Sequence, residues 1–313
     1  MKRIVVTGAA GQIGTEMVVA LRERYGRDSV LATDIRIPEG ETGGPFALAD
    51  VTIGDSLDAA VARHRADTIF HLAAILSAVG EQRPQKTYEV NIGGLFNVLE
   101  VARARECAVF TPSSIAAFGP GTPIDLTPQD TIQRPNTMYG VSKVAGELLC
   151  DYYHHRFGVD TRGVRYPGLV SWLTQPGGGT TDYAVEIYHD AVESGRYECF
   201  LAAGTQLDMM YMPDAIRAAI ELMEADPSRL EHRNAFNITA MQVTPASLAD
   251  SIRQHLPGFE ISYAVDPIRQ AIADSWPRHI DDSAAQNEWG WAPAFDAASM
   301  TADMLANLQT GSP

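Results

Sequence analysis

RIVVTGAAGQIG, residues 3–14, is the stretch that decides the fold of this chain. It begins with a short apolar run of the kind that forms a buried strand, and the rest of it carries three glycines, at positions 8, 11 and 14. The residues that follow place Ile13, Met17 and Leu21 on one helical stripe. A strand, a glycine turn and a helix in this order predict a dinucleotide site.

The turn supplies the first predicted cofactor-binding residues. Glycine allows a pyrophosphate to approach the backbone closely, and the free N–H groups at the start of the helix attract its charge. We therefore expect these positions to hold the cofactor: Gly8, Gly11, Gln12, Ile13 and Gly14. A turn with a purely structural role is the simpler alternative.

Asp34 indicates which dinucleotide is bound. It ends the next apolar run, twenty residues after Gly14. A carboxylate at this point accepts hydrogen bonds from a ribose 2′-hydroxyl and repels a 2′-phosphate. The sequence therefore favours NAD over NADP, although Arg36 is a signal in the opposite direction.

Apolar runs alternate with helical patterns through the first half of the chain. The runs read RIVVTG, SVLATD, TIFHLAA, CAVFTPSS and TRGVRYPG. This alternation predicts an α/β fold with a doubly wound parallel sheet, the Rossmann fold. After Arg165 glycine, proline, methionine and aromatic residues become frequent. We expect an NAD-binding domain over residues 1–170, a smaller mixed α/β substrate region over 171–313, and segments near 205–240 that pack back on the first domain.

Composition narrows the class of protein. The chain has 313 residues and a formal net charge of −15, which disfavours nucleic acid and anionic membranes as partners. Its three cysteines, Cys107, Cys150 and Cys199, form no metal-ligand spacing, so no metal site is expected. The first strand starts almost at Met1 and no apolar run is long enough to span a membrane, which predicts a cytoplasmic protein.

Other strand ends extend the predicted cofactor pocket. An acidic residue at the end of the third strand can meet an adenine, and small residues after the fourth leave room for the ligand. The positions are Asp50 and Val51 for the third strand, Leu72, Ala73 and Ala74 for the fourth, Asn91 in the following helix, and Tyr166 after a later strand.

MYGVSK, residues 138–143, carries the predicted catalytic pair. Tyr139 and Lys143 are four residues apart at the start of a helical pattern, so they share one face. A lysine cation and an oxidised nicotinamide both favour a phenolate, which lowers the pKa of the tyrosine. Tyr139 could then accept the proton of an alcohol. TPSSIAAFG supplies Ser113 and Ser114 to complete the site.

Together these motifs resemble the extended short-chain dehydrogenase/reductase superfamily, which includes nucleotide-sugar epimerases. The resemblance rests on TGAAGQIG, Asp34, HLAA, SSIAAFG, YGVSK and RYPG, and on the closing segment DDSAAQNEWGWAP. It implies that Ser114 is the catalytic serine. It also implies a homodimer, paired through the helices that carry Asn91 and Tyr139.

The substrate loop separates members of this superfamily. Between Tyr166 and Gly195 there is no lysine or arginine, so a nucleotide diphosphate would lack a cationic partner. RYPGLVSWLTQPGGGTTDYAVEIYHDA, AGTQLDMMYMPDAIRA and DPIRQAIADSWP resemble the short-chain type of L-threonine 3-dehydrogenase. That resemblance implies metal-free oxidation of the β-hydroxyl of L-threonine by NAD to 2-amino-3-oxobutyrate.

The same resemblance suggests which residues contact the amino acid. Thr180 and Thr181 would bind the carboxylate, while Asp182 either faces the ammonium or caps the following helix. Trp276 either closes the pocket or only packs. The full set of substrate-binding candidates is Ser77, Ser114, Tyr139, Gly178, Thr180, Thr181, Asp182 and Trp276.

Two other functions are compatible with the sequence. One is a nucleotide-sugar epimerase or dehydratase on the same fold, against which the substrate loop argues. The other is a cofactor-sensing regulator without catalysis, which would not need Tyr139 and Lys143.

Overall fold

The computed structural model describes residues 1–38, 42–173 and 179–310, with only the backbone of Ala78. The chain forms two compact units. Unit 1 comprises Met1–Ala117, Thr137–Arg165 and Ile216–Phe236, and unit 2 comprises Phe118–Asn136, Tyr166–Ala215 and Asn237–Pro313.

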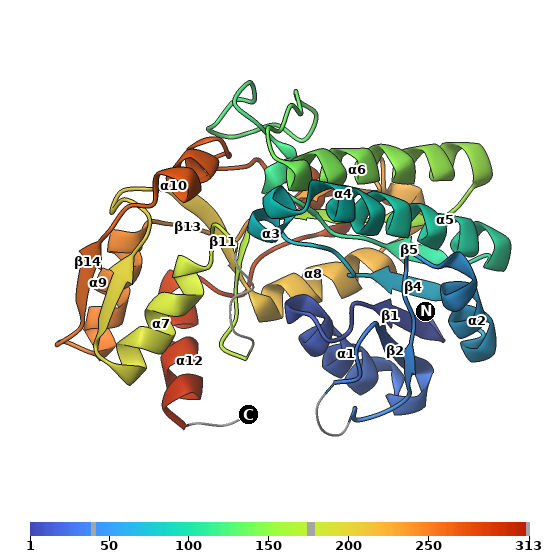
Figure 1. Ribbon diagram of the computed structural model, residues 1–313, viewed down its shortest axis with the longest axis horizontal. Helices are drawn as coiled ribbons and strands as arrows, with labels where there is room; N and C mark the ends of the chain where they lie inside the picture. The colour runs from blue at the N-terminus through green and yellow to red at the C-terminus, as the bar shows by residue number, and fades with distance from the viewer. Residues whose placement is uncertain (39–41, 174–178, 311–313) are drawn as a thin grey trace. The chain divides into compact units, whose positions relative to one another are not determined.

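A six-stranded parallel sheet with the order β3-β2-β1-β4-β5-β7 forms the centre of unit 1 (Figure 1). Thr7 of β1 aligns with Thr33 of β2 and with His71 of β4, so these strands end at one edge. The predicted α/β fold with a doubly wound parallel sheet is confirmed. The strands are β1 (Ile4–Thr7), β2 (Val30–Asp34), β3 (Phe46–Leu48), β4 (Thr68–His71), β5 (Ala108–Phe110) and β7 (Thr161–Arg162).

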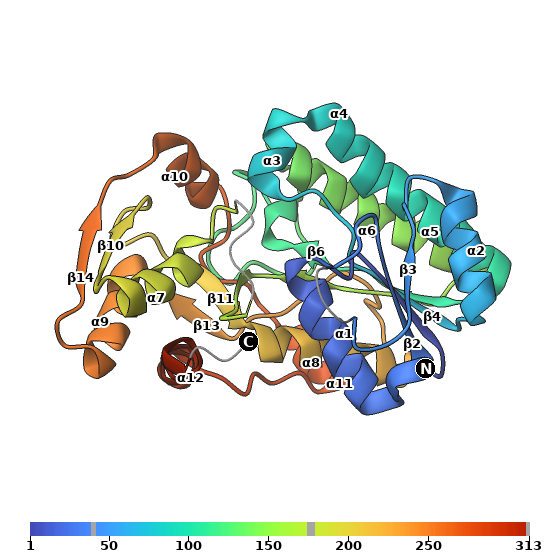
Figure 2. The ribbon, with the colours of Figure 1, turned by 60° about the horizontal axis from the view of Figure 1, so that its bottom comes forward.

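Helices cover both faces of this sheet because successive strand residues point to opposite sides. Val5, Ile69 and Val109 belong to one buried cluster with α2, α5 and α6, and α5 and α6 run side by side (Figures 1 and 2). Helix α1, whose Met17 and Leu21 are buried, lies on the other side of the sheet (Figure 1). The helices are α1 (Gln12–Tyr25), α2 (Gly54–His64), α3 (Ser77–Gln82), α4 (Pro84–Thr87), α5 (Gly94–Arg105) and α6 (Met138–Phe157), with the short helical turns η1 (Arg27–Ser29), η2 (Tyr88–Gly93), η3 (Ile115–Ala117) and η4 (Pro227–Arg229).

Helix α6 begins and ends at strong local signals. The Thr137 hydroxyl accepts a hydrogen bond from the Gly140 N–H at 3.0 Å, which caps the first turn. Gly158 adopts a left-handed conformation with φ of 72° just after the last residue, which is the usual way for glycine to end a helix. These signals fix the helix so that Tyr139 lies in its first turn.

Unit 2 contains smaller mixed sheets. β11 pairs parallel with β9 and antiparallel with β13, and β10 pairs parallel with β14. Tyr188 of α7 is fully buried and shares a hydrogen bond of 2.8 Å with Thr301 of α12. The elements are β9 (Gly168–Val170), α7 (Tyr183–Glu193), β10 (Arg196–Cys199), β11 (Leu207–Tyr211), β13 (Met241–Val243), α9 (Pro245–His255), β14 (Glu260–Tyr263), α10 (Pro267–Asp274), α11 (Ser283–Trp289) and α12 (Ala297–Thr310).

Three short strands form a further sheet with the order β12-β8-β6. They are β6 (Ser113–Ser114), β8 (Val164–Tyr166) and β12 (Phe236–Asn237), and α8 (Met212–Glu224) follows β11 directly. No helix in the described residues is long and apolar enough to cross a membrane.

Candidate active site

The glycine turn after β1 packs directly against the backbone that follows β4. Gly8 has a φ of +69°, and a Cβ there would lie 2.6 Å from the Ala73 nitrogen. A Cβ on Gly14 would lie 2.1 Å from the Gly8 carbonyl oxygen. The Gly11 N–H donates to the same oxygen at 3.0 Å, which closes the turn. Glycine is therefore required at positions 8 and 14 by close packing and not only by flexibility.

The start of α1 is built to accept an anion. Its N-cap, Gly11, provides no side-chain acceptor, and the first turn contains no acidic residue. Gln12 and Ile13 are partly exposed there. Because the first N–H groups of a helix have no partner within the helix, this end suits a pyrophosphate.

Asp34 lies where the sequence predicts it, as the last residue of β2, and it is buried. Its carboxylate accepts hydrogen bonds from the Ala10 N–H at 3.0 Å and from the Arg36 N–H at 3.2 Å. The first bond ties β2 to the glycine turn. The Arg36 side chain is exposed, so Asp34 is the charged group held in place at this edge.

The sequence predicts that Asp50 and Val51 end the third strand, and this prediction is wrong. β3 stops at Leu48, and the two residues form the turn that follows. The Asp50 carboxylate accepts from the N–H and the hydroxyl of Thr52 at 2.9 and 2.7 Å, a local bonding pattern that competes with strand pairing. Val51 is buried, and a Cβ on Gly94 of α5 would lie 2.8 Å from its side chain.

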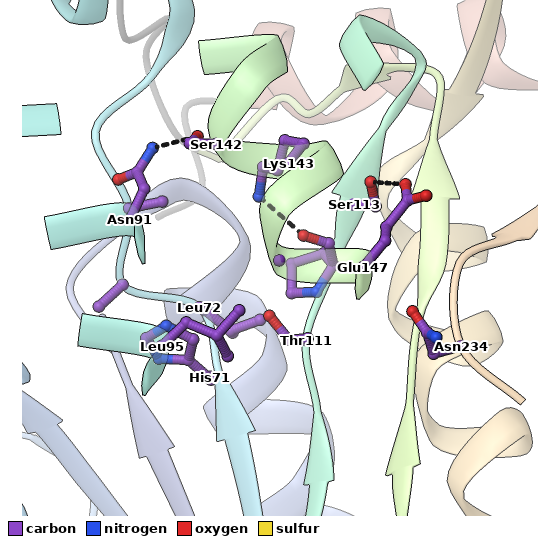
Figure 3. A pocket seen from close by; sticks show the side chains of 14 residues that line it. His71, Leu72, Asn91, Leu95, Thr111, Ser113, Ser142, Lys143, Glu147 and Asn234 are labelled. Carbon is purple, nitrogen blue, oxygen red and sulfur yellow. Dashed lines mark hydrogen bonds between the residues drawn. The ribbon is translucent and has the colours of Figure 1, made fainter. Parts of the chain in front are cut away.

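A pocket lies at the carboxyl ends of β4 and β5 and beside α6 (Figure 3). Ligands of open parallel sheets bind at this edge. Several predicted cofactor residues are brought together here, while Ser114 and Tyr139 are not part of the lining. The residues that line it are His71, Leu72, Ala73, Ala74, Asn91, Leu95, Thr111, Pro112, Ser113, Ser142, Lys143, Gly146, Glu147 and Asn234.

Asn91 holds the chain that leaves β4. Its side-chain oxygen accepts from the Ile75 N–H at 2.8 Å and its amide donates to the Ile75 carbonyl at 3.0 Å. The amide also donates to the Ser142 hydroxyl of α6 at 3.1 Å (Figure 3). Ser77 lies buried two residues further on, at the start of α3. Asn91 therefore positions the segment that carries Ser77.

Tyr139 and Lys143 share one face of the first turns of α6, as their spacing predicts. The Lys143 ammonium nitrogen lies 5.3 Å from the centre of the Tyr139 ring. It donates to the Pro112 carbonyl at 2.7 Å. The Lys143 cation therefore contacts both the Tyr139 ring and the backbone that follows β5.

The serine pair lies beyond β5 rather than at its end. β5 stops at Phe110, and Ser113 and Ser114 form the separate strand β6. Pro112, which lies between the two strands, has no N–H to donate to a neighbouring strand. The Ser113 hydroxyl donates to Glu147 of α6. The Ser114 hydroxyl accepts from the Ala116 N–H at 3.2 Å. Ser113 is therefore the serine whose hydroxyl bonds to α6, while the Ser114 hydroxyl bonds to the backbone that follows β6.

His71 is fully inside the protein at the end of β4. Burial, with the nearby Lys143 cation adding to it, lowers the pKa of His71 to about 3. Its Nδ1 shares a hydrogen bond of 2.9 Å with the Thr7 hydroxyl. His71 is therefore neutral at ordinary pH and adds no charge to the pocket.

The predicted amino-acid-binding residues of the substrate loop belong to unit 2. Thr180 is buried and Thr181 is partly buried. Asp182 stands at the N-cap position of α7, but its carboxylate accepts from the Gly179 N–H at 2.6 Å instead of bonding the helix. Gly178 lies outside the described residues.

Two further predicted residues are engaged within unit 2. The Tyr166 hydroxyl donates to the Ala215 carbonyl at 2.6 Å, and burial raises its pKa. Trp276 is buried just after α10, where its backbone N–H donates to the Ala273 carbonyl. The described residues contain no group of three histidine, cysteine, aspartate or glutamate side chains placed to hold a metal ion.

The acidic residues of the substrate loop and of α7 do not gather at one place. Glu186, Asp190 and Glu193 line a surface hollow of α7, and the Tyr197 hydroxyl donates to Glu186 at 2.9 Å. Only Asp182 lies in the loop itself. The argument from charge against an anionic substrate therefore rests on the absence of lysine and arginine between Tyr166 and Gly195.

Comparison with known proteins adds to this geometry. The sequence profile of the NAD dependent epimerase/dehydratase family matches residues 4–239. The chain belongs to this family. An uncharacterized epimerase/dehydratase of Staphylococcus haemolyticus is 56% identical over 99% of this chain and 98% of its own.

Solved structures show the same fold in close relatives. L-threonine dehydrogenase from Clostridium difficile is 53% identical with a TM-score of 0.98, covering 99% of this chain and 98% of its own. The holo form of the GalE-like L-threonine dehydrogenase from Cupriavidus necator is 51% identical with a TM-score of 0.95, covering 98% and 99%. This family member is therefore an NAD-dependent oxidoreductase of the extended short-chain class.

Several lining residues of the pocket were absent from the sequence prediction. Glu147 follows Lys143 by four residues on the same helix, and this spacing was a usable signal. Ser142 is next to Lys143 in the chain, and its spacing gave no such signal. Thr111 and Asn234 come from segments far apart in the chain, and no pattern in the sequence connects them.

Proposed function

We propose that this chain is an NAD-dependent L-threonine 3-dehydrogenase that oxidises the β-hydroxyl of L-threonine to 2-amino-3-oxobutyrate. The supporting observation is the Tyr139–Lys143 pair on α6 in a chain that is similar over its whole length to a solved L-threonine dehydrogenase. The glycine turn, the start of α1 and Asp34 fit the cofactor, which takes the hydride when bound.

The residues of α6 and β6 supply the proton chemistry in this proposal. Tyr139 accepts the proton of the β-hydroxyl as its carbon is oxidised. Tyr139 must be a phenolate before it accepts that proton, and the Lys143 cation, 5.3 Å from the ring centre, stabilises the negative charge of this phenolate. The Ser114 hydroxyl holds the substrate oxygen. Ser113 is excluded from that role because its hydroxyl donates to Glu147.

Residues of unit 2 are proposed to bind the amino acid. Thr180 and Thr181 contact the carboxylate together with backbone N–H groups of the same loop. Asp182 is the candidate for the ammonium. Its carboxylate is already fixed by the Gly179 N–H, which holds a negative charge at the start of α7.

NADH absorbance tests the proposal. The pure protein, dialysed against a chelator, should form NADH from NAD and L-threonine, with much less from L-serine, L-allo-threonine or with NADP. Tyr139→Phe should lower kcat by at least about a hundredfold, because a general base typically contributes that much. Loss of activity after chelation, with recovery on adding zinc, would contradict the metal-free mechanism.

The family profile also favours a second candidate, a nucleotide-sugar epimerase or dehydratase. UDP-galactose distinguishes the two, since an epimerase would bind and convert it. Turnover of the sugar nucleotide without turnover of L-threonine would replace the first proposal by the second.

We further propose a homodimer formed through α5 and α6. Their outer faces expose large apolar side chains: Phe96, Val141, Leu148 and Tyr152. Leu148, 63% exposed, is the most accessible of them. Leu148→Glu should convert a dimer to a monomer in sedimentation analysis, whereas a wild-type protein that sediments as a monomer would exclude the dimer.

A further inference from the structure

Glu147 lies one helical turn after Lys143 and is paired with Arg165. The Arg165 Nε and Nη2 donate to the two carboxylate oxygens at 3.0 and 2.8 Å. Both side chains are only 7% exposed. The Ser113 hydroxyl donates to the same carboxylate, so α6, β8 and β6 meet at this ion pair.

The ion pair changes the electrostatic potential at Tyr139. Glu147 is eight residues from Tyr139, about 12 Å along the helix axis. A bare carboxylate there would disfavour a phenolate and oppose the Lys143 cation. Arg165 cancels it. Because His71 is neutral, Lys143 is left as the pocket-lining cation with no ion pair to a carboxylate in the described residues.

Charged groups on the other elements packed against α6 are paired or lie in solvent. Lys86 of α4 pairs with Glu89 of η2, Arg103 with Glu100 on α5, and Arg162 of β7 with Asp160. Glu81 of α3 accepts from the Met138 N–H at the exposed start of α6. On α6 itself, burial raises the pKa of Asp151, which accepts from Asn234. The Glu147–Arg165 pair is buried, and its carboxylate lies on α6 one helical turn after Lys143.

We propose that Arg165 is a positioning residue of the reaction, which neutralises Glu147 so that the Lys143 cation acts undiminished on Tyr139. The inference rests on the proposed role of Tyr139 as the base. It differs from a purely structural role because it predicts electrostatic effects of opposite sign from the two partners.

Two single variants and their combination test the proposal. Arg165→Met leaves a negative charge and should raise the midpoint of the ascending limb of the kcat/KM pH profile. Glu147→Gln leaves a positive charge and should lower it. Each shift is expected to be about 0.5–1 pH unit at an effective dielectric constant near 20. The double variant Glu147→Gln/Arg165→Met should return the midpoint to the wild-type value.

Arg165→Lys is the matched control, because it keeps the charge and alters the geometry. It should leave the midpoint in place even if kcat or stability falls. Removing one partner of a buried pair can prevent folding, so circular dichroism accompanies each variant. If Arg165→Met does not fold, Glu147→Gln and the double variant still carry the test.

A second readout does not depend on the substrate. Tyrosinate absorbance is titrated without cofactor in each protein, and the same titration of its Tyr139→Phe counterpart is subtracted. The difference should shift in the same directions as the kinetic midpoints. If L-threonine is not turned over but these spectral shifts occur, the proposed function is wrong and the role of Arg165 stands. Unchanged midpoints, or shifts of one sign in both single variants, would overturn the role of Arg165.

Discussion

Replacement of Gly8 by alanine should lower the free energy of unfolding for two reasons, the left-handed backbone conformation and the steric overlap of the added Cβ. A comparison with Gly158 separates these two contributions. Gly8 and Gly158 both have left-handed backbone, with φ of +69° and +72°. A Cβ at Gly8 would lie 2.6 Å from the Ala73 nitrogen and 2.8 Å from the Leu72 carbonyl carbon, whereas a Cβ at Gly158 meets nothing within 4 Å. Gly158→Ala is therefore a control for the backbone conformation alone.

The expected magnitudes differ accordingly. Left-handed backbone costs a non-glycine residue about 1–2 kcal/mol, which both variants bear. Gly8→Ala adds the overlap with the backbone that follows β4, about 1–3 kcal/mol, because backbone cannot move aside as a flexible side chain can. The free energy of unfolding should therefore fall by about 1–2 kcal/mol in Gly158→Ala and by about 2–5 kcal/mol in Gly8→Ala.

Denaturant unfolding measures the two free energies, and NAD titration adds a second comparison. Gly8→Ala should also weaken NAD binding, since the turn that it distorts is the proposed pyrophosphate site, while Gly158→Ala should leave binding unchanged. Equal losses of stability in the two variants would show that the close approach of the turn to the chain after β4 has no energetic consequence, and the explanation for Gly8 would be wrong.

Three other expectations concern single side chains. Asp34→Ser should reduce the preference for NAD over NADP by about 10–100-fold in kcat/KM, because the carboxylate that repels a 2′-phosphate is lost while Arg36 stays nearby; an unchanged ratio would remove Asp34 from cofactor selection. His71 has a folded pKa of about 3, below its unfolded value, so its stabilising contribution is complete above pH 6.5 and is lost as the pH falls towards 3. Urea unfolding at pH 7 and pH 5 should show a loss of about 2 kcal/mol in the wild type that is absent from His71→Asn, and equal losses would show that His71 is not the sensitive group. Asn91→Ala should raise KM for NAD more than it lowers kcat, because Ile75 loses both of its bonds to the side chain; steady-state kinetics with a normal KM would refute this.

The sequence predicts most of the sheet because its strands are short apolar runs with a glycine, proline or polar residue after each. The Tyr139–Lys143 face and the position of Asp34 follow from helical and strand periodicity in the same way. The end of β3 was placed too late because Asp50 bonds to Thr52, and a local bond of that kind leaves no trace in an apolar pattern. Arg165 and Glu147 are on different elements, so their pairing depends on how β8 meets α6 and could not be read from spacing.

The segments of unit 1 are interrupted by those of unit 2, and this has a consequence for synthesis on the ribosome. The last segment of unit 1 ends at Phe236, and two segments of unit 2 are made before it. The glycine turn near the N-terminus therefore emerges long before its unit can be complete. A nascent chain arrested before Phe236 would hold an unfinished unit 1, and no single cut of the gene would yield either unit alone.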